Sequence, residues 1–487
     1  MGHHSLRAVL AILLCALVLA SPTVPAQARP KLADYFTEIP ETQLDPSYSS
    51  VGGFGIQTGY LDFNADGQQD LLVLGYDTPA SGLPFTGQLR PGRLFVGDGN
   101  GHFTPAPASL FPISTLQTMG CGSHFGDFNG DGRPDMFVAC GGWDVFQGPG
   151  EQNHLYLTTP EGTWRDATDT LPQLSDRTES GAAIGDVSGR GILDIFVGNG
   201  VQGANGIPPY MLLNTGSGQF TRSNAGLPTG NNQILDPYSG HNFSTATLAD
   251  LDGDGRADLI AGGGSLKPRA TILWNRAGLF AATDTTLLPK PASFPNTSTD
   301  SAIASIDVNQ DGLPDLVSVG RQLTFHGWYL QILVNHGNHT FVDETADRVQ
   351  PADASRGTEG VDTASVIPKG GGLQILDFNQ DGAPDISVGF QPDLVATLTP
   401  DQPLVWLNDS AGHFSTLTVG DFVAAGKGTV LGTGRLVATR NGYSFINVSF
   451  NGKVGRPLTV TGMLATKPYR LRVYPQCFLG AGCSGPL

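Results

Sequence analysis

The chain has 487 residues, with 44 acidic and 27 basic side chains and a formal net charge of −17 at neutral pH. This charge excludes the basic surface that a nucleic-acid-binding protein needs. A hydrophobic content of 39% excludes a disordered chain, while 66 glycines and 34 prolines favour many short strands joined by tight turns.

The N-terminus, residues 1–28, predicts a cleaved signal peptide. A basic stretch ends at Arg7, an apolar run covers residues 8–20, and Ala26-Gln27-Ala28 gives the small-x-small pattern that a signal peptidase needs. An uncleaved membrane anchor is the alternative, but the apolar run is shorter than the roughly 20 residues that span a bilayer. We therefore expect a secreted or extracellular protein, or one in the periplasm or on the surface of a bacterial cell, with no transmembrane segment after signal removal.

Four cysteines follow the signal peptide, and an even number in an oxidising compartment favours two disulfides. We predict the near-neighbour pairs Cys121–Cys140 and Cys477–Cys483. Four cysteines allow three connectivities, so the sequence leaves the other two open.

One phrase of nine residues recurs six times along the chain. Its intact form is Asp-x-Asn/Asp-x-Asp-Gly-x-x-Asp, and its first aspartates are 57 to 70 residues apart, a period that indicates stacked structural units. A short apolar run bounded by glycine follows each copy and predicts a buried strand. About twenty residues later a second strand ends in a turn and an aromatic residue. The copies lie at 62–70, 127–135, 186–194, 250–258, 307–315 and 377–385.

Each unit predicts one four-stranded antiparallel blade, and blades arranged radially make an all-β propeller. At this period the mature chain has room for seven blades, with six or eight as alternatives. We expect the seventh blade at 426–466, without an aspartate phrase, and its outer strand near the N-terminus at 35–38. The predicted propeller covers 29–467, and a tail with a small disulfide loop follows at 468–487.

The aspartate phrase predicts a calcium site. Side-chain oxygens stand at positions 1, 3, 5 and 9, a glycine at position 6 allows the sharp bend, and no nitrogen or sulfur ligand is offered, which suits a hard cation. An Asx-Gly turn without metal is the alternative, and recurrence favours the metal. The predicted ligands are Asp62, Asn64, Asp66, Asp70, Asp127, Asn129, Asp131, Asp135, Asp250, Asp252, Asp254, Asp258, Asp307, Asn309, Asp311, Asp315, Asp377, Asn379, Asp381 and Asp385.

The third copy, 186–194, departs from this pattern. Ser188 and Arg190 occupy positions 3 and 5, so that an arginine stands where a ligand is required. We predict no calcium there and expect the charge of the arginine to replace the ion. The protein should therefore hold about five structural calcium ions.

The aspartate phrases and the apolar strands that follow them resemble FG-GAP/VCBS repeat proteins, the group that includes the integrin α-subunit propeller. The resemblance covers about residues 50–415. It implies a seven-bladed ring, calcium at positions 1, 3, 5 and 9 of each intact phrase, and extracellular binding or adhesion. It does not imply a particular ligand, since some relatives are sugar-binding lectins and others carry propellers beside separate catalytic domains.

Candidate ligand-binding residues lie outside the phrases. Trp143, in a glycine-rich segment beside Cys140, could be a stacking platform for a sugar or a hot spot for a protein, and packing over a neighbouring blade is the alternative. Five polar residues precede predicted inner strands and could meet at the mouth of the channel as a catalytic or second metal cluster, or simply be solvated. These are His124, Glu179, His241, Asp300 and Glu359.

We therefore expect a monomeric binding, adhesion or scaffold module for an extracellular protein or glycan. A secreted lyase or hydrolase acting on polysaccharide is the alternative. The sequence contains neither a Gly-x-Ser-x-Gly nor a His-Glu-x-x-His motif, which favours the binding module.

Overall fold

The computed structural model describes residues 54–68, 70–76, 90–98, 103–118, 121–140, 150–174, 181–198, 207–229, 245–262, 270–322, 326–361, 366–377, 379, 381–392, 399–424, 434–439, 443–450 and 470–475. The predicted signal peptide and the pair Cys477–Cys483 lie outside these residues.

Six four-stranded antiparallel sheets form the body of the protein, as the repeat predicts. In each sheet the chain runs from strand to neighbouring strand, and the aspartate phrase joins the first strand to the second. The strands of blades 1 to 3 are β1 (Phe54–Leu61), β2 (Asp70–Tyr76), β4 (Arg93–Gly97), β5 (Phe103–Pro105), β7 (Cys121–Gly126), β8 (Asp135–Cys140), β9 (His154–Thr158), β10 (Trp164–Asp166), β11 (Ala182–Gly185), β12 (Asp194–Val197), β13 (Tyr210–Asn214) and β14 (Phe220–Ser223). Those of blades 4 to 6 are β15 (Thr245–Ala249), β16 (Asp258–Gly262), β17 (Thr271–Asn275), β18 (Phe280–Leu287), β19 (Ser298–Ile306), β20 (Asp315–Gln322), β21 (Trp328–Asn335), β22 (Phe341–Asp343), β24 (Val366–Leu376), β25 (Asp385–Pro392), β26 (Pro403–Asn408) and β27 (Phe414–Thr418).

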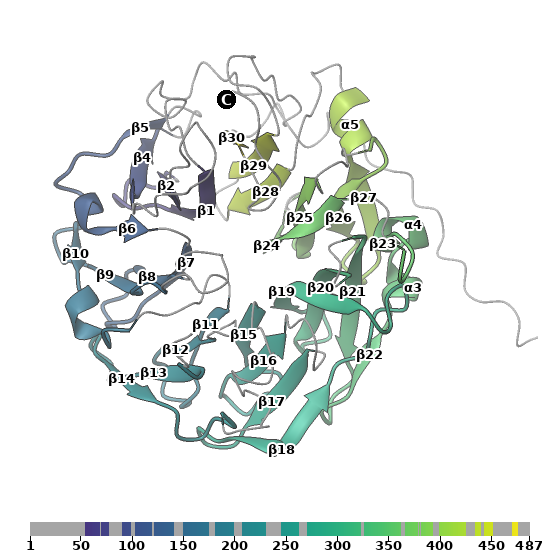
Figure 1. Ribbon diagram of the computed structural model, residues 1–487, viewed down its shortest axis with the longest axis horizontal. Coiled ribbons are helices and arrows are strands. Elements are labelled where there is room, and N and C mark those ends of the chain that lie inside the picture. Colours follow the sequence, from purple (N-terminus) through teal and green to yellow (C-terminus); the bar gives the residue numbers. More distant parts are fainter. Residues whose placement is uncertain are drawn as a thin grey trace, which may run out of the picture.

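The blades stand around a common centre, with their first strands innermost and their fourth strands at the rim (Figure 1). Small elements decorate this ring: β23 pairs with β21, and β3 pairs with β6. None of the helices in the described part of the chain is long and apolar enough to cross a membrane. The decorating elements are β3 (Arg90–Pro91), β6 (Gln117–Thr118), β23 (Ser355–Arg356), α3 (Thr345–Arg348), α4 (Pro351–Ala354), α5 (Val419–Ala424) and the 3₁₀ turns Ile113–Thr115 and Thr168–Thr170.

The prediction of seven four-stranded blades is wrong, because the described residues form six. The C-terminal stretch makes a three-stranded sheet of β28 (Gly434–Thr439), β29 (Tyr443–Phe450) and β30 (Arg470–Pro475), in which β29 and β30 run parallel. This stretch has no aspartate phrase between its strands, and its third strand returns in the wrong direction for an antiparallel blade. The last strand also falls within the predicted tail, and the predicted N-terminal outer strand at 35–38 lies outside the described residues.

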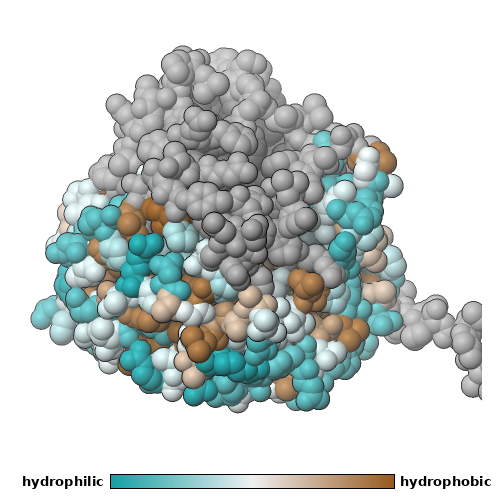
Figure 2. Space-filling model, turned by 60° about the horizontal axis from the view of Figure 1, so that its bottom comes forward, coloured by the Kyte–Doolittle hydropathy of each residue, from teal (hydrophilic) through white to brown (hydrophobic). Residues whose placement is uncertain are grey.

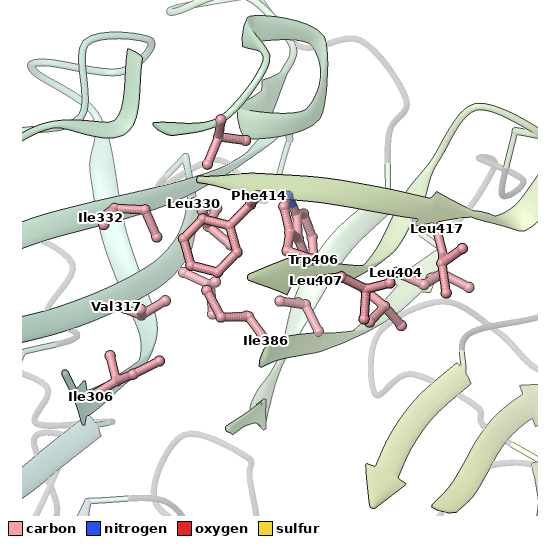
Figure 3. Packing of buried hydrophobic residues seen from close by; sticks show 14 of the residues in the cluster. Ile306, Val317, Leu330, Ile332, Ile386, Leu404, Trp406, Leu407, Phe414 and Leu417 are labelled. Carbon is pink, nitrogen blue, oxygen red and sulfur yellow. The ribbon is translucent and has the colours of Figure 1, made fainter. Parts of the chain in front are cut away.

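Among the described residues, the hydrophobic core is divided into five layers, each lying between two consecutive blades. In the layer between blades 5 and 6, Ile332 from β21 and Trp406 from β26 pack with Phe414 from β27 (Figure 3). The other four layers join blades 1 and 2, 2 and 3, 3 and 4, and 4 and 5. Because a blade buries its apolar faces only against its neighbours, the fold depends on contacts between blades.

A side-chain amide at the end of the third strand fastens each of four blades to the blade before it. The Nδ2 atom donates a hydrogen bond of 2.7–2.9 Å to the backbone carbonyl of the residue at position 2 of the preceding aspartate phrase. These contacts are Asn214 to Phe128, Asn275 to Val187, Asn335 to Leu251 and Asn408 to Val308. Between blades 1 and 2, Nε1 of Trp164 makes the same contact with the carbonyl of Phe63 at 2.9 Å.

Each of these asparagines is almost fully buried and uses its other hydrogen-bonding capacity within its own blade. Asn335, for example, also donates to the carbonyl of Pro314 at 3.0 Å and accepts from the backbone amide of Gly337 at 2.9 Å. Its loss would leave several buried backbone groups unpaired. Unpaired buried backbone groups lower the free energy of unfolding, so the asparagines hold the blades in register as well as in contact.

We expect Asn335→Ala to lower the free energy of unfolding by about 2–4 kcal/mol, because it leaves the carbonyls of Leu251 and Pro314 and the amide of Gly337 without partners. Chemical denaturation measures this change. The control is Glu161→Ala, in an exposed turn of blade 2, which should change stability by less than about 0.5 kcal/mol. Equal effects of the two variants would contradict the role of Asn335.

Candidate metal-binding loops

Position 1 organises every intact aspartate phrase through the backbone. One carboxylate oxygen accepts the amide of position 5 at 3.0–3.2 Å, and the other accepts the amide of the glycine at position 6 at 2.7–3.1 Å. That glycine has a φ between 80° and 89° in all five loops, a conformation that favours glycine. The aspartate and the glycine therefore fold each phrase into one tight loop, as the sequence predicts. The aspartates at position 1 are Asp62, Asp127, Asp250, Asp307 and Asp377.

Positions 3 and 5 repeat their contacts with the same regularity. The side-chain oxygen of position 3 accepts the amide of position 5 at 2.9–3.3 Å, and one carboxylate oxygen of position 5 accepts the amide of position 7 at 2.8–2.9 Å. In the four loops with asparagine at position 3, its Nδ2 atom donates to the other oxygen of position 5 at 2.7–3.2 Å. All three side chains are therefore turned toward one another.

The loop at 250–258 has an aspartate at position 3 and shows the convergence most clearly. Oxygen atoms of Asp250, Asp252 and Asp254 all lie within 4.8 Å of one another. Three carboxylates at this separation repel one another, and a cation at their centre would remove the repulsion. The donor set contains oxygen only, so the residues present fit a hard divalent cation.

Neighbouring side chains already neutralise part of this charge. Asp252 forms an ion pair with Arg276 at 3.0 Å and contacts Nε2 of His339 at 3.3 Å. The His339 ring stacks on Trp274 with a centroid distance of 3.8 Å. Because His339 belongs to the β21–β22 turn of the next blade, it links this loop across the interface. A cation would compete with both side chains for Asp252.

Position 9 differs from the other three, since its aspartate is buried and bonded to the blade. The carboxylate accepts the amide of position 2 at 2.8–3.0 Å in four loops, and an amide at the end of the third strand at 2.7–2.9 Å in all five. Burial raises the pKa of Asp70 and Asp258 to about 7 and that of Asp135 and Asp315 to about 6, although the backbone amides act against it. These aspartates tie each loop to its blade, and their role as metal ligands stays a prediction.

The altered phrase at 186–194 keeps the loop but not the ligand set. Asp186 still accepts the backbone amides of Gly189 and Gly191, at 2.8 and 2.5 Å. The guanidinium of Arg190 donates to the hydroxyl of Ser188 at 2.7 Å and to the carbonyl of Asn214 at 2.9 Å. An arginine thus bridges this loop to the third strand, and the absence of calcium there stays a prediction.

The predicted cluster at the channel mouth is only partly described. His124 on β7 lines a cavity of about 270 Å³ at the centre of the ring, and its Nε2 atom is buried without a hydrogen-bond partner among the described residues. Glu359 accepts the amide of Asn296 at 2.6 Å and lines neither this cavity nor the small one beside Asp300. Trp143, Glu179 and His241 lie outside the described residues.

Asp300, half-buried on β19, lines a separate, small cavity of about 20 Å³. Its carboxylate accepts hydrogen bonds from the hydroxyls of Ser318 and Tyr329, at 2.7 and 2.9 Å. Burial raises the pKa of this carboxyl, although its hydrogen bonds act against it. The described residues His124, Asp300 and Glu359 therefore do not meet in one cavity.

The raised pKa of Asp300 predicts a pH-dependent stability. A carboxyl whose pKa is higher in the folded state stabilises the fold fully below the unfolded value of about 3.8, and this contribution is lost as pH rises through the raised pKa. We expect Asp300→Asn, which keeps a hydrogen-bond acceptor, to flatten this decline in unfolding free energy above pH 4. Denaturation curves across pH measure it, with the exposed Asp169→Asn as control. A wild-type curve that rises with pH relative to Asp300→Asn would contradict the prediction.

Comparison with known proteins supports the repeat assignment. The family model of the FG-GAP-like repeat matches residues 62–138 and 250–318. No curated protein matches the chain. Among solved structures, the biofilm matrix protein Bap1 of V. cholerae is similar at 13% identity with a TM-score of 0.31, over 63% of this chain and 41% of that protein. This chain therefore spans less than half of Bap1. A GH32 β-fructofuranosidase of Bombyx mori in complex with sucrose is similar at 11% identity with a TM-score of 0.27, over 98% of this chain and 94% of the enzyme.

The structural likenesses are too low to carry an argument, so the assignment depends on the repeat matches and on the blades themselves. Both matched segments begin at an intact aspartate phrase and contain a second one. The ring of four-stranded antiparallel blades is the architecture that such repeats predict. The chain folds as a β-propeller and carries FG-GAP-like repeats at residues 62–138 and 250–318.

Proposed function

We propose that this protein is an exported, calcium-stabilised propeller that acts as a binding or scaffold module for an extracellular protein or glycan. The observation that carries the calcium part is the shared geometry of the five intact loops. In each of them the carboxylate at position 1 and the side-chain oxygen at position 3 accept the same backbone amide, that of position 5. In the loop at 250–258, where all three positions are aspartates, their oxygens lie within 4.8 Å of one another.

Calcium suits these loops better than magnesium does. Calcium accepts six to eight oxygen ligands in flexible geometry, whereas magnesium demands a near-ideal octahedron and keeps several waters. Asn64, Asn129, Asn309 and Asn379 each offer a neutral carbonyl oxygen beside two carboxylates, which limits the repulsion within the loop. The residues that would hold the ion are those at positions 1, 3 and 5, with the buried aspartate at position 9 fixing the loop to the blade.

The role of the ion would be structural. A calcium site that is present only in the folded state adds about 1.4 kcal/mol to the free energy of unfolding when free calcium is ten times its dissociation constant. Five sites of this kind would equal a large share of the roughly 5–15 kcal/mol that stabilises a typical domain. Since residue 2 of four of these loops accepts a hydrogen bond from the next blade, an ordered loop also supports the interface between blades.

The binding role follows from the architecture and from the predicted export. A rigid ring presents the connections between its strands on exposed faces, where loops commonly carry contacts. The rim of the described blades is largely hydrophilic, with apolar side chains in small groups (Figure 2). A hydrophilic rim supports the proposal of a rigid ring whose rim is exposed to water while its loops bind a partner.

Removal of calcium tests the proposal that calcium stabilises the fold. We expect an excess of chelator to lower the melting temperature by about 10 °C, because five sites lose their ions. Titration calorimetry should count five ions in the wild type and four in Asp311→Asn. The control Ser188→Ala, in the altered loop, should keep five. An unchanged melting curve in chelator, together with no heat of calcium binding, would contradict the proposal.

A disulfide between Cys121 and Cys140 tests export to an oxidising compartment. The two residues are directly opposed partners on β7 and β8, a spacing that a disulfide can bridge. We expect peptide mapping without reductant to find this crosslink in protein recovered from its native compartment. Reduction should lower stability by about 3 kcal/mol, the value for a loop of about this length. Free thiols at both residues in that material would refute the predicted pair.

A further inference from the structure

A cavity of about 270 Å³ lies at the centre of the ring, where the innermost strands of five blades meet. Its described walls come from β7, β11, β15, β19 and β24, which surround the centre in Figure 1. The volume is close to the lower limit of roughly 300 Å³ for pockets that bind small molecules. None of the described wall residues belongs to an aspartate phrase, so the cavity is independent of the proposed calcium sites.

The walls are mostly aliphatic and carry no formal charge among the described residues. Ile184, Ala304 and Leu373 supply apolar surface, while Thr245 and Ser301 supply hydroxyl groups. Another wall hydroxyl, that of Thr247, is already bonded to the carbonyl of Ile303 at 2.6 Å. A charged ligand would lose part of its hydration here without gaining a counter-charge from the described walls, and this favours a neutral ligand.

One polar atom in this wall lacks a partner. Nε2 of His124 is buried and makes no hydrogen bond to any residue that the structure describes. Burial lowers the pKa of His124 to about 4, so the imidazole is neutral at physiological pH. A buried polar atom without a partner costs free energy. Because Nε2 has almost no accessible surface, the imidazole would have to turn toward the cavity to pair with a ligand, and this pairing would recover the cost.

The chemistry of a neutral imidazole narrows the ligand class. Nε2 either donates or accepts a hydrogen bond, depending on the tautomer. A hydroxyl group serves both tautomers because it is donor and acceptor at once. A molecule with many hydroxyls would place several of them against aliphatic walls, where they find no partner. The walls therefore favour one hydroxyl on an aliphatic body.

We propose that the central channel binds a small, neutral aliphatic alcohol, with its hydroxyl paired to Nε2 of His124 and its hydrocarbon body against the inner strands. This assigns a ligand site to the propeller that the calcium loops do not provide.

The experiment compares four probes with the full-length protein in calcium-containing buffer. Cyclohexanol is the matched alcohol, cyclohexylammonium and cyclohexanecarboxylate carry opposite charges on the same ring, and glucose is the polyhydroxyl probe. We expect saturable binding of cyclohexanol with a dissociation constant on the order of 1 mM, the range of a fragment of this size. Ligand-observed NMR measures binding, and methyl shifts of labelled Ile184 and Ile303 locate it.

Two variants test the assigned contacts. His124→Phe keeps an aromatic ring but removes the nitrogen, and it should weaken cyclohexanol binding roughly fivefold. Ala304→Leu fills part of the cavity and should abolish binding while His124 stays intact. The control Ala281→Leu makes the same change on the exposed outer strand β18 and should bind as the wild type does. Melting curves confirm that each variant is folded.

Several outcomes would overturn the proposal. These are the absence of saturable cyclohexanol binding, equal binding of the charged probes, tighter binding of glucose, or unchanged binding in both channel variants. Because the assay runs with calcium present and the folded state is checked separately, failure here leaves the calcium proposal intact. Failure of calcium binding would likewise not remove the cavity.

Discussion

Where the structure describes position 2 of an aspartate phrase, its backbone is held by hydrogen bonds to the blades, and the contacts between blades depend on this junction. In four loops the buried carboxylate at position 9 of the same phrase accepts its amide, and at four of the interfaces an asparagine of the next blade donates to its carbonyl. One residue therefore joins a loop, its own blade and the following blade. Both bonds are buried, where an unpaired backbone group costs about 1–3 kcal/mol, so neither blade can shift without breaking them.

This junction complements the hydrophobic packing, which lies between the blades. The core is spread over layers between blades, and no blade encloses a core of its own. Hydrophobic contact alone would allow neighbouring blades to slide. The hydrogen bonds from Asn214, Asn275, Asn335 and Asn408 fix the register, because each reaches the carbonyl at the same position of the preceding loop. The hydrogen bonds therefore fix the register of the blades, and the hydrophobic packing holds the blades in contact.

The sequence predicts the repeated parts of this structure well and the unique parts poorly. Six aspartate phrases at regular spacing are sufficient to place six blades, because each copy carries its own strand signals. The C-terminal sheet was not predictable in this way: without a phrase to mark a turn, alternation of apolar residues does not distinguish parallel from antiparallel pairing. The asparagine contacts were missed, although an asparagine ends the third strand in four units, as in Leu213-Asn214 and Val334-Asn335. The sequence predicts that His124 and Asp300 meet at the mouth of the channel, but the two residues line different cavities. Which cavity each one lines depends on how the blades pack, and no local sequence pattern encodes this packing.

Arg190 gives one sector of the ring a permanent charge. Its guanidinium bonds to the carbonyl of Asn214, and the side chain of the same asparagine fastens blade 3 to Phe128 of blade 2. An arginine keeps its proton at any physiological pH and cannot be drawn away by competing solutes. The residue at position 2 of this altered loop, Val187, accepts a hydrogen bond from Nδ2 of Asn275, so the seam between blades 3 and 4 begins at a loop that we expect to hold no ion. This end of the seam would not change with the calcium concentration, and it gives an otherwise repetitive circle one fixed point of reference.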